Sequence, residues 1–175
     1  EEQFECRWLD ARRYVITDDT FREARVDWTT TENNLCQLLP ITGVTLTQGF
    51  IGSNGTYTTT LGREGSDFSA AIFASCLQAE SVTIWKDVPG VMTADPKRLS
   101  DAQTFEELPF REAAEMTYYG ASVIHPKTIK PLANKGIPLL VKNFDYPSLD
   151  GTHIYECRLD KIPPLIVFKE NQCLI

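Results

Sequence analysis

The chain has 175 residues, of which 42% are hydrophobic and 23% charged, so it can bury the core of one domain and is not a disordered or fibrous protein. Its formal net charge of −7 argues against a nucleic-acid partner, because binding the phosphate backbone requires clustered Lys and Arg. No apolar run reaches the ~18 residues of a membrane span. The five cysteines form no C-x-x-C pair, which favours a reducing, cytoplasmic location.

The first 40 residues begin without methionine and mix charges with scattered apolar side chains, as the interior of a longer protein does. We therefore expect the chain to be a fragment. A strand is predicted over 43–51, where the sequence reads G-V-T-L-T-Q-G-F-I. Ser53-Asn54-Gly55 predicts a hairpin turn, because Asn-Gly readily adopts the positive φ angles of tight turns, and a returning strand is predicted over 57–61.

The returning strand leads into Gly62-Arg63-Glu64-Gly65, after which a helix is predicted over 68–79 with Ser66 as its N-cap. A strand, a glycine turn and a helix start together favour anion binding, because free backbone N–H groups face the same space as the planar guanidinium of Arg63. Two interpretations remain open. In one, Arg63 pairs with a substrate carboxylate and Asp67 binds an amino group. In the other, this is a surface turn with a capping serine and an acidic first helical turn.

A strand predicted over 81–86 completes a strand, helix, strand sequence, which is typical of a βαβ unit in a parallel sheet. Ligands of open parallel sheets bind at the carboxyl ends of the strands, so we expect 62–67 and 86–98 to face one cleft. The loop 86–98 carries two prolines, two aspartates and three cations. It could wrap a nucleotide, with Lys97 or Arg98 on the phosphates, or it could be a solvated connector.

Two helices are predicted next, over 110–119 and 126–135, and each is followed by a glycine that suits a helix end. His125 precedes the second helix and is expected to cap it rather than to act in catalysis. A buried strand is predicted over 137–144. From Ser148 onward the pattern changes, and an apolar strand starting at 165–168 indicates the entry to a second domain.

Four stretches of the chain resemble aspartokinases, which are members of the amino acid kinase family. They are T-Q-G-F-I-G (47–52), T-T-T-L-G-R-E-G-S-D (58–67), W-K-D-V-P-G-V-M-T-A-D-P (85–96) and E-A-A-E-M-T-Y-Y-G-A-S-V-I-H-P (112–126). The resemblance implies an α/β fold, a three-layer αβα sandwich of the carbamate kinase-like type, with this chain as its C-terminal, nucleotide-binding portion. It also implies transfer of the ATP γ-phosphoryl group to the β-carboxylate of L-aspartate, which gives 4-phospho-L-aspartate for lysine, threonine and methionine biosynthesis.

The resemblance further implies the residues of the site. Asp67 is expected to be catalytic and to bind substrate, together with Phe50, Arg63, Gly65 and Ser66. The expected nucleotide-binding residues are Lys86, Asp87, Met92, Lys97, Ser122 and Val123. The substrates would be L-aspartate and ATP, with Mg²⁺ bridging the ATP phosphates and no metal site in the protein itself.

Three positions depart from the family pattern. Ser122 stands where many members carry lysine, which would move one phosphate contact to Lys127 or remove it, and Lys97 replaces an arginine. Glu64 replaces a glycine or small polar residue and is expected to point to solvent, although it places negative charge near an anionic substrate. The family's N-terminal K-[FY]-G-G-T-S motif is missing from this sequence, so the isolated chain is expected to be inactive.

By the same resemblance, residues 1–154 would belong to the catalytic domain, and 155–175 to a linker and the first strand of an ACT regulatory domain, through which the parent would form a homo-oligomer. Two alternatives remain. One is another amino acid kinase, acting on glutamate, acetylglutamate or UMP, which the motif at 58–67 disfavours. The other is a non-catalytic nucleotide-binding or regulatory module, for which Ser122 is the best support.

Overall fold

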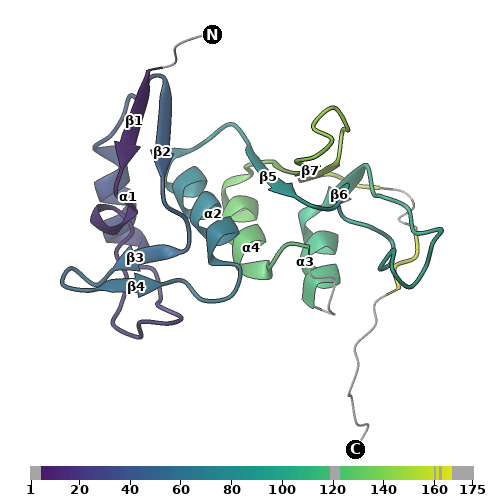
Figure 1. Cartoon of the computed structure of the whole chain (residues 1–175), viewed down its shortest axis with the longest axis horizontal. Helices are drawn as coiled ribbons and strands as arrows, with labels where there is room; N and C mark the ends of the chain where they lie inside the picture. The colour runs from purple at the N-terminus through teal and green to yellow at the C-terminus, as the bar shows by residue number, and fades with distance from the viewer. Residues whose placement is uncertain (1–4, 119–122, 160, 162, 167–175) are drawn as a thin grey trace, which may run out of the picture. The chain divides into compact units, whose positions relative to one another are not determined.

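The computed structural model describes residues 5–118, 123–159, 161 and 163–166 (Figure 1). The chain divides into two compact units, an N-terminal unit, Glu1–Ala79, and a C-terminal unit, Glu80–Ile175. None of the helices in the described ranges is both long enough and apolar enough to cross a membrane.

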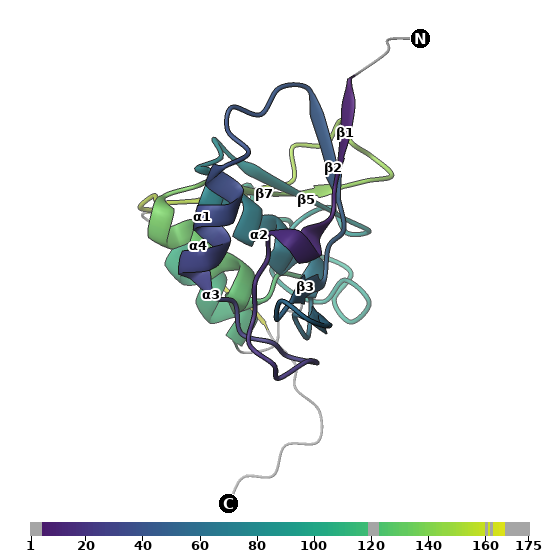
Figure 2. The same cartoon turned by 90° about the vertical axis from the view of Figure 1, so that its left-hand side faces the viewer.

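The N-terminal unit combines two small sheets with two α-helices. Its elements are β1 (Cys6–Leu9), the 3-10 helix η1 (Ala11–Arg13), α1 (Trp28–Cys36), β2 (Val44–Thr47), β3 (Ile51–Ser53), β4 (Thr58–Thr60) and α2 (Gly65–Leu77). Strands β1 and β2 pair in parallel, whereas β3 and β4 form an antiparallel hairpin. Helix α1 packs against α2 (Figure 2).

The predicted hairpin turn is confirmed. Strand residues Ile51 and Thr60 are paired, and the connection between β3 and β4 is closed by the Asn54 side chain. Its Oδ1 accepts hydrogen bonds from the backbone N–H groups of Thr56 and Tyr57 at 3.1 and 2.7 Å. Gly55 has a φ of +92°, as expected for a glycine in a tight turn.

The prediction of one continuous strand over 43–51 is wrong, because the chain leaves β2 after Thr47 and enters β3 only at Ile51. The break is at Phe50, whose φ of +73° is incompatible with extended strand geometry. Its N–H donates to the Ser69 hydroxyl of α2 at 2.8 Å instead of to a neighbouring strand. An alternating apolar pattern cannot reveal such a tertiary hydrogen bond.

The core of the N-terminal unit lies among Val15, Leu35, Leu61, Ile72 and Cys76, all buried. Each fully buried aliphatic side chain of this kind contributes about 1.5–3 kcal/mol. Helix α1, which the sequence pattern did not predict, starts at an N-cap, since the Asp27 carboxylate accepts from the Thr30 N–H at 3.1 Å. The core therefore fixes α2, which carries much of the candidate site.

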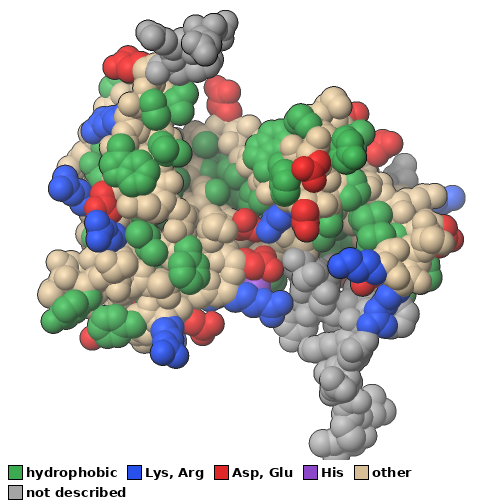
Figure 3. Space-filling model, viewed as in Figure 1, with side chains coloured by type: hydrophobic (Ala, Val, Ile, Leu, Met, Phe, Trp, Pro, Cys, Tyr) green, Lys and Arg blue, Asp and Glu red, His purple; other side chains and the backbone are tan. Residues whose placement is uncertain are grey.

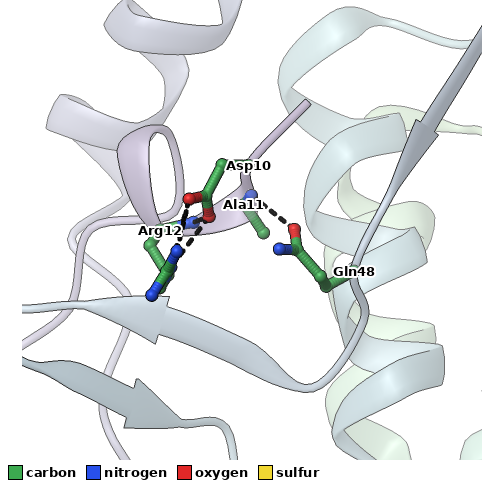
Figure 4. Close-up of polar contacts among 4 residues, drawn as sticks. All are labelled: Asp10, Ala11, Arg12 and Gln48. Carbon is green, nitrogen blue, oxygen red and sulfur yellow. Dashed lines mark hydrogen bonds and ion pairs between the residues drawn. The ribbon is translucent and has the colours of Figure 1, made fainter. Parts of the chain in front are cut away.

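A polar cluster connects η1 to the segment before Phe50 (Figure 4). The Asp10 carboxylate caps η1 and forms an ion pair with Arg12 at 2.6 Å. The hydrogen bond from the Arg12 side chain lowers the pKa of Asp10 from 3.8 to about 2. Because the folded pKa lies below the ordinary value, the stabilisation is present at neutral pH and is lost as the pH falls toward 2. Ala11 N–H donates to Gln48 Oε1 at 2.8 Å, which fixes the approach to Phe50.

Strands β1 and β2 present an exposed apolar face. Trp8, Val44 and Leu46 are all exposed, and Trp8 and Leu46 are paired across the two strands. Figure 3 shows hydrophobic side chains gathered over these strands. Parallel sheets are usually covered on both faces, so this face differs from the common pattern.

The C-terminal unit is built on one four-stranded sheet. Its elements are β5 (Val82–Lys86), β6 (Glu107–Pro109), α3 (Phe110–Tyr118), α4 (Pro126–Lys135), β7 (Leu139–Asn143) and β8 (Thr152–Tyr155). The strand order is β5-β7-β8-β6, with β5 parallel to β7, β6 parallel to β8, and β7 antiparallel to β8.

The predicted βαβ unit is wrong, because β4 and β5 belong to different sheets. One edge of β4 pairs with β3. The other edge is taken by an upstream segment, since Thr60 N–H donates to Phe21 O at 2.6 Å and Ala24 N–H donates to Thr60 O at 2.9 Å. The parallel partner of β5 is instead β7, and the connection between them contains α3 and α4.

The predicted strands over 81–86 and 137–144 are confirmed as β5 and β7, and the helix over 126–135 is confirmed as α4. His125 Nδ1 accepts from the Lys127 N–H at 3.1 Å, so its expected capping role is also confirmed. Helix α3 begins at the predicted residue, but its expected glycine stop at Gly120 lies outside the described residues. Residues 163–166 form no strand, and the rest of the strand predicted over 165–168 lies outside the described ranges.

Thr152 on β8 fixes the long loop that follows β5. Its fully buried hydroxyl accepts from Val91 N–H at 2.8 Å and donates to Phe105 O at 2.6 Å. A Cβ at Gly90 would lie 2.5 Å from the same oxygen, so only glycine allows this approach. One hydroxyl thus connects both ends of the loop to the sheet.

We predict that Thr152→Val lowers the free energy of unfolding by about 2–4 kcal/mol, because the substitution leaves a buried N–H and a buried carbonyl without a partner. Urea denaturation of the purified chain measures this change.

The matched control is Thr128→Val. Thr128 on α4 is also fully buried, but its hydroxyl has no hydrogen-bond partner among the described residues. The same change of shape should therefore raise the free energy of unfolding by about 1 kcal/mol. Equal effects at the two positions would contradict this account of Thr152.

Candidate functional site

The five residues predicted to bind substrate are brought together at one corner of the N-terminal unit, called the corner below: Phe50, Arg63, Gly65, Ser66 and Asp67. It is formed by the segment before β3, the turn after β4 and the start of α2. Leu61 N–H donates to Phe50 O at 2.9 Å, and Gly65 N–H donates to Gly62 O at 3.1 Å. These two bonds bring segments that are distant in sequence into one structure.

Ser69 is the residue that joins the parts of the corner, and sequence reasoning missed it. The residue is 3% exposed, and its hydroxyl accepts from Phe50 N–H at 2.8 Å and donates to Gly65 O at 2.9 Å. The available signal was a serine at a helical position spaced to face the core, because a buried hydroxyl needs partners.

Two glycines permit the close approach of the segments. A Cβ at Gly49 would lie 3.1 Å from Ser66 Cα, and a Cβ at Gly65 would lie 2.6 Å from Phe50 Cδ2. Any side chain at Gly65 would displace the Phe50 ring. Phe50 can therefore lie directly against residue 65 only because that residue is a glycine.

Helix α2 begins one residue before Ser66, so the prediction that Ser66 is its N-cap is wrong. The N-cap is Glu64, which has φ +53° and ψ +34° and whose side chain makes no capping hydrogen bond. The glycine turn closes the chain early, through the bond from Gly65 N–H to Gly62 O. Ser66 is therefore an exposed residue of the first helical turn, next to the half-buried Asp67.

Arg63 is the cation of the corner. It is exposed, and the structure gives it no ion pair with any residue it describes. Acidic residues lie nearby. The Glu23 side chain lies against Gly62, since a Cβ at Gly62 would be 2.9 Å from Glu23 Cγ. Glu64 and Asp67 follow Arg63 in the sequence. A planar guanidinium without an internal partner is suited to a ligand carboxylate.

The prediction that Glu64 points to solvent is wrong for one of its oxygens. The residue is half-buried, and its Oε2 is shielded from solvent and has no hydrogen-bond partner in the described part of the chain. The negative charge that Glu64 adds to the corner is therefore held partly inside the protein.

The predicted nucleotide-binding residues lie in the C-terminal unit. Lys86 ends β5 and is paired with Asn143 at the end of β7, so both residues mark the carboxyl edge of these parallel strands. Asn143 is buried, and its Oδ1 accepts from the N–H groups of Asp145 and Tyr146 at 2.8 and 3.0 Å. Asp87 follows Lys86 and is exposed.

The loop after β5 has a well-defined backbone. Met92 pairs with Thr104, and Thr93 N–H donates to Gln103 O at 2.8 Å. Asp95 organises the next turn, since its Oδ1 accepts from Lys97 N–H at 2.9 Å. The Lys97 side chain is exposed on this turn.

Two further nucleotide-binding predictions concern the segment before α4. Val123 is half-buried in a turn, and Ser122 lies outside the described residues. The corner and the loop belong to different units, so the prediction that they face one cleft stays a prediction. In the described part of the chain, no group of three or more His, Cys, Asp or Glu side chains could hold a metal ion.

Comparison with known proteins identifies the family. The model of the amino acid kinase family matches residues 3–143. The chain is 42% identical to lysine-sensitive aspartokinase 3 of Escherichia coli over 182 aligned residues, which cover 100% of this chain and 40% of that protein. The chain therefore spans about two fifths of the length of this relative.

Solved structures agree with the sequence comparison. E. coli aspartokinase III in complex with aspartate and ADP matches with a TM-score of 0.85 and 41% identity, over 90% of this chain and 36% of that one. Carbamate kinase from Giardia lamblia matches at 11% identity with a TM-score of 0.55, over 86% of this chain and 62% of that one, and so shows the fold alone. The predicted α/β fold class is confirmed, and the chain belongs to the amino acid kinase family.

Proposed function

We propose that this chain provides the aspartate-binding corner and the nucleotide loop of an aspartokinase. The observation that carries the proposal is the corner itself, where Ser69 holds Phe50 against Gly65. Beside them lies Arg63, which forms no ion pair within the ranges that the structure describes. A protein 41% identical to this chain has been solved with aspartate and ADP, which supports the same ligand classes here.

In this proposal, Arg63 binds one carboxylate of L-aspartate through its two parallel N–H groups. Asp67, in the first turn of α2, accepts from the substrate ammonium group and thereby orients the substrate. Phe50, Gly65 and Ser66 form the wall of the site. The other carboxylate, on the β-carbon, is left free to react.

The proposed reaction is a phosphoryl transfer. A β-carboxylate oxygen attacks the γ-phosphorus of ATP, and the bond from that phosphorus to the β–γ bridging oxygen breaks, so that 4-phospho-L-aspartate and ADP form. Such transition states are loose, and the protein acts through positioning and charge neutralisation. Lys86 and Lys97 provide positive charge near the phosphates, with Asp87, Met92, Ser122 and Val123 as further nucleotide contacts. Mg²⁺ would arrive with ATP and bridge its phosphates.

Several wider proposals follow from the same resemblance. The parent enzyme would serve lysine, threonine and methionine biosynthesis in the cytoplasm. Residues 1–154 would belong to its catalytic domain and 155–175 to a linker and an ACT strand, through which the subunits would assemble. Aspartate is favoured over UMP or carbamate as the substrate, because UMP and carbamate kinases resemble this chain at only 11–22% identity.

We predict that Arg63→Ala weakens L-aspartate binding by about 30-fold or more, because a bidentate, charge-assisted pair is lost. Isothermal titration calorimetry on the full chain measures the affinity. Arg63→Lys should give an intermediate affinity, since it keeps the charge and loses the fork. Arg13→Ala removes another exposed arginine of the N-terminal unit and should leave the affinity unchanged; equal affinities for all variants would refute the role of Arg63.

We predict that Lys97→Ala lowers the affinity for Mg²⁺-ATP by about tenfold, the effect of losing one charge-assisted phosphate contact. The affinity for L-aspartate should not change. Lys130→Ala, which removes an exposed lysine from α4, is the matched control. An unchanged affinity for ATP would show that the turn held by Asp95 is only a connector.

A further inference from the structure

Glu64 has an unusual backbone conformation for its residue type. Its φ of +53° and ψ of +34° lie in the left-handed region, which glycine adopts readily and which a residue with a Cβ adopts at a cost. The glycine turn forces this conformation on whichever residue occupies the N-cap of α2. Glutamate is thus an unfavourable choice on backbone grounds.

The Glu64 side chain is also held unfavourably. Its Oε2 is shielded from solvent and lacks a hydrogen-bond partner among the residues that the structure describes, and the side chain does not cap the helix that follows it. A buried carboxylate oxygen without a donor is costly. Backbone strain and an unpaired polar atom therefore coincide at one residue, and such features concentrate at functional sites.

The position of Glu64 indicates what the missing donor could be. The residue lies between Arg63 and Gly65, so an acidic residue directly follows the cation of the corner in the sequence. An amino acid presents a carboxylate and an ammonium group on the same carbon, which is the complementary pair of charges. Asp67, which the proposed function places on the same ammonium group, has an interaction within the chain. An ammonium group carries three N–H donors, so Glu64 can accept from it beside Asp67.

We propose that Glu64 is a specificity-determining residue whose carboxylate accepts a hydrogen bond from the ammonium group of the amino-acid substrate, while Arg63 binds its carboxylate. This inference rests on the proposed function and adds a residue to it. It explains why a glutamate occupies a position that the backbone favours for glycine. The cost is offset when the substrate provides the donor.

The test compares two ligands that differ in the ammonium group. L-Aspartate carries it, and succinate is the same dicarboxylate without it. Both are titrated calorimetrically into the full chain and into Glu64→Gln, which keeps the shape of the side chain and removes its charge. We expect Glu64→Gln to lower the affinity for L-aspartate by about tenfold and to leave the affinity for succinate unchanged or higher.

Glu80→Gln is the matched control, because Glu80 is an exposed glutamate just beyond the other end of α2. It should change neither affinity. If Glu64→Gln raises both affinities by the same factor, Glu64 is only a repelling charge and the assignment is overturned. An unchanged ratio of the two affinities likewise overturns the assignment, and it leaves the corner as a dicarboxylate site that depends on Arg63.

A second variant tests whether Glu64 is held at a cost. Glu64→Gly should raise the melting temperature of the unliganded chain by about 2–4 °C, because glycine relieves the strain and removes the unpaired oxygen. A lower melting temperature would overturn the inference, since Glu64 would then be present for stability. Absence of any L-aspartate binding to the unaltered chain would overturn the proposed function, and the Glu64 assignment with it.

Discussion

The corner depends on one buried hydroxyl. Ser69 accepts a hydrogen bond from Phe50 N–H and donates one to Gly65 O, so a single side chain of α2 holds both the segment before β3 and the start of its own helix. These two bonds occur together with the left-handed backbone of Phe50 and with the absence of a side chain at Gly65, where a Cβ would lie 2.6 Å from Phe50 Cδ2. The break between β2 and β3, the early start of α2 and the exposure of Arg63 all accompany this arrangement. Local geometry, more than the regular elements, thus creates the candidate site.

The C-terminal unit contains a comparable arrangement of a buried hydroxyl and an irregular loop. There the Thr152 hydroxyl binds Val91 N–H and Phe105 O, which fixes the loop carrying Met92 and Lys97 on the sheet. In both units a buried hydroxyl holds irregular backbone against a regular element, because backbone polar groups removed from water need partners. The chain carries a net charge of −7, so the anion-binding positions that we propose depend on a few local cations on these irregular segments.

Local signals in the sequence predicted local structure well. Asn54 and Gly55 predicted the hairpin turn, and His125 with Gly136 predicted both ends of α4, because each acts through backbone geometry within a few residues. Predictions failed where a distant contact decides the conformation. The alternating pattern over 43–51 could not show that Ser69 captures Phe50, and the order of elements could not show that residues 21–24 occupy the edge of β4. All five corner residues were predicted from the family motif, whereas Ser69 was not, since its role appears only when α2 is placed against Phe50.

The central claim is that the corner is a binding site for L-aspartate built around the Ser69 hydroxyl. The most direct test is a titration of the ¹⁵N-labelled full chain with L-aspartate, followed by amide NMR spectra. The account predicts saturable shifts centred on the amides of Phe50, Gly65 and Ser66, which lie at the junction that Ser69 holds. Shifts that are absent, or that fall on residues away from the corner, would contradict it.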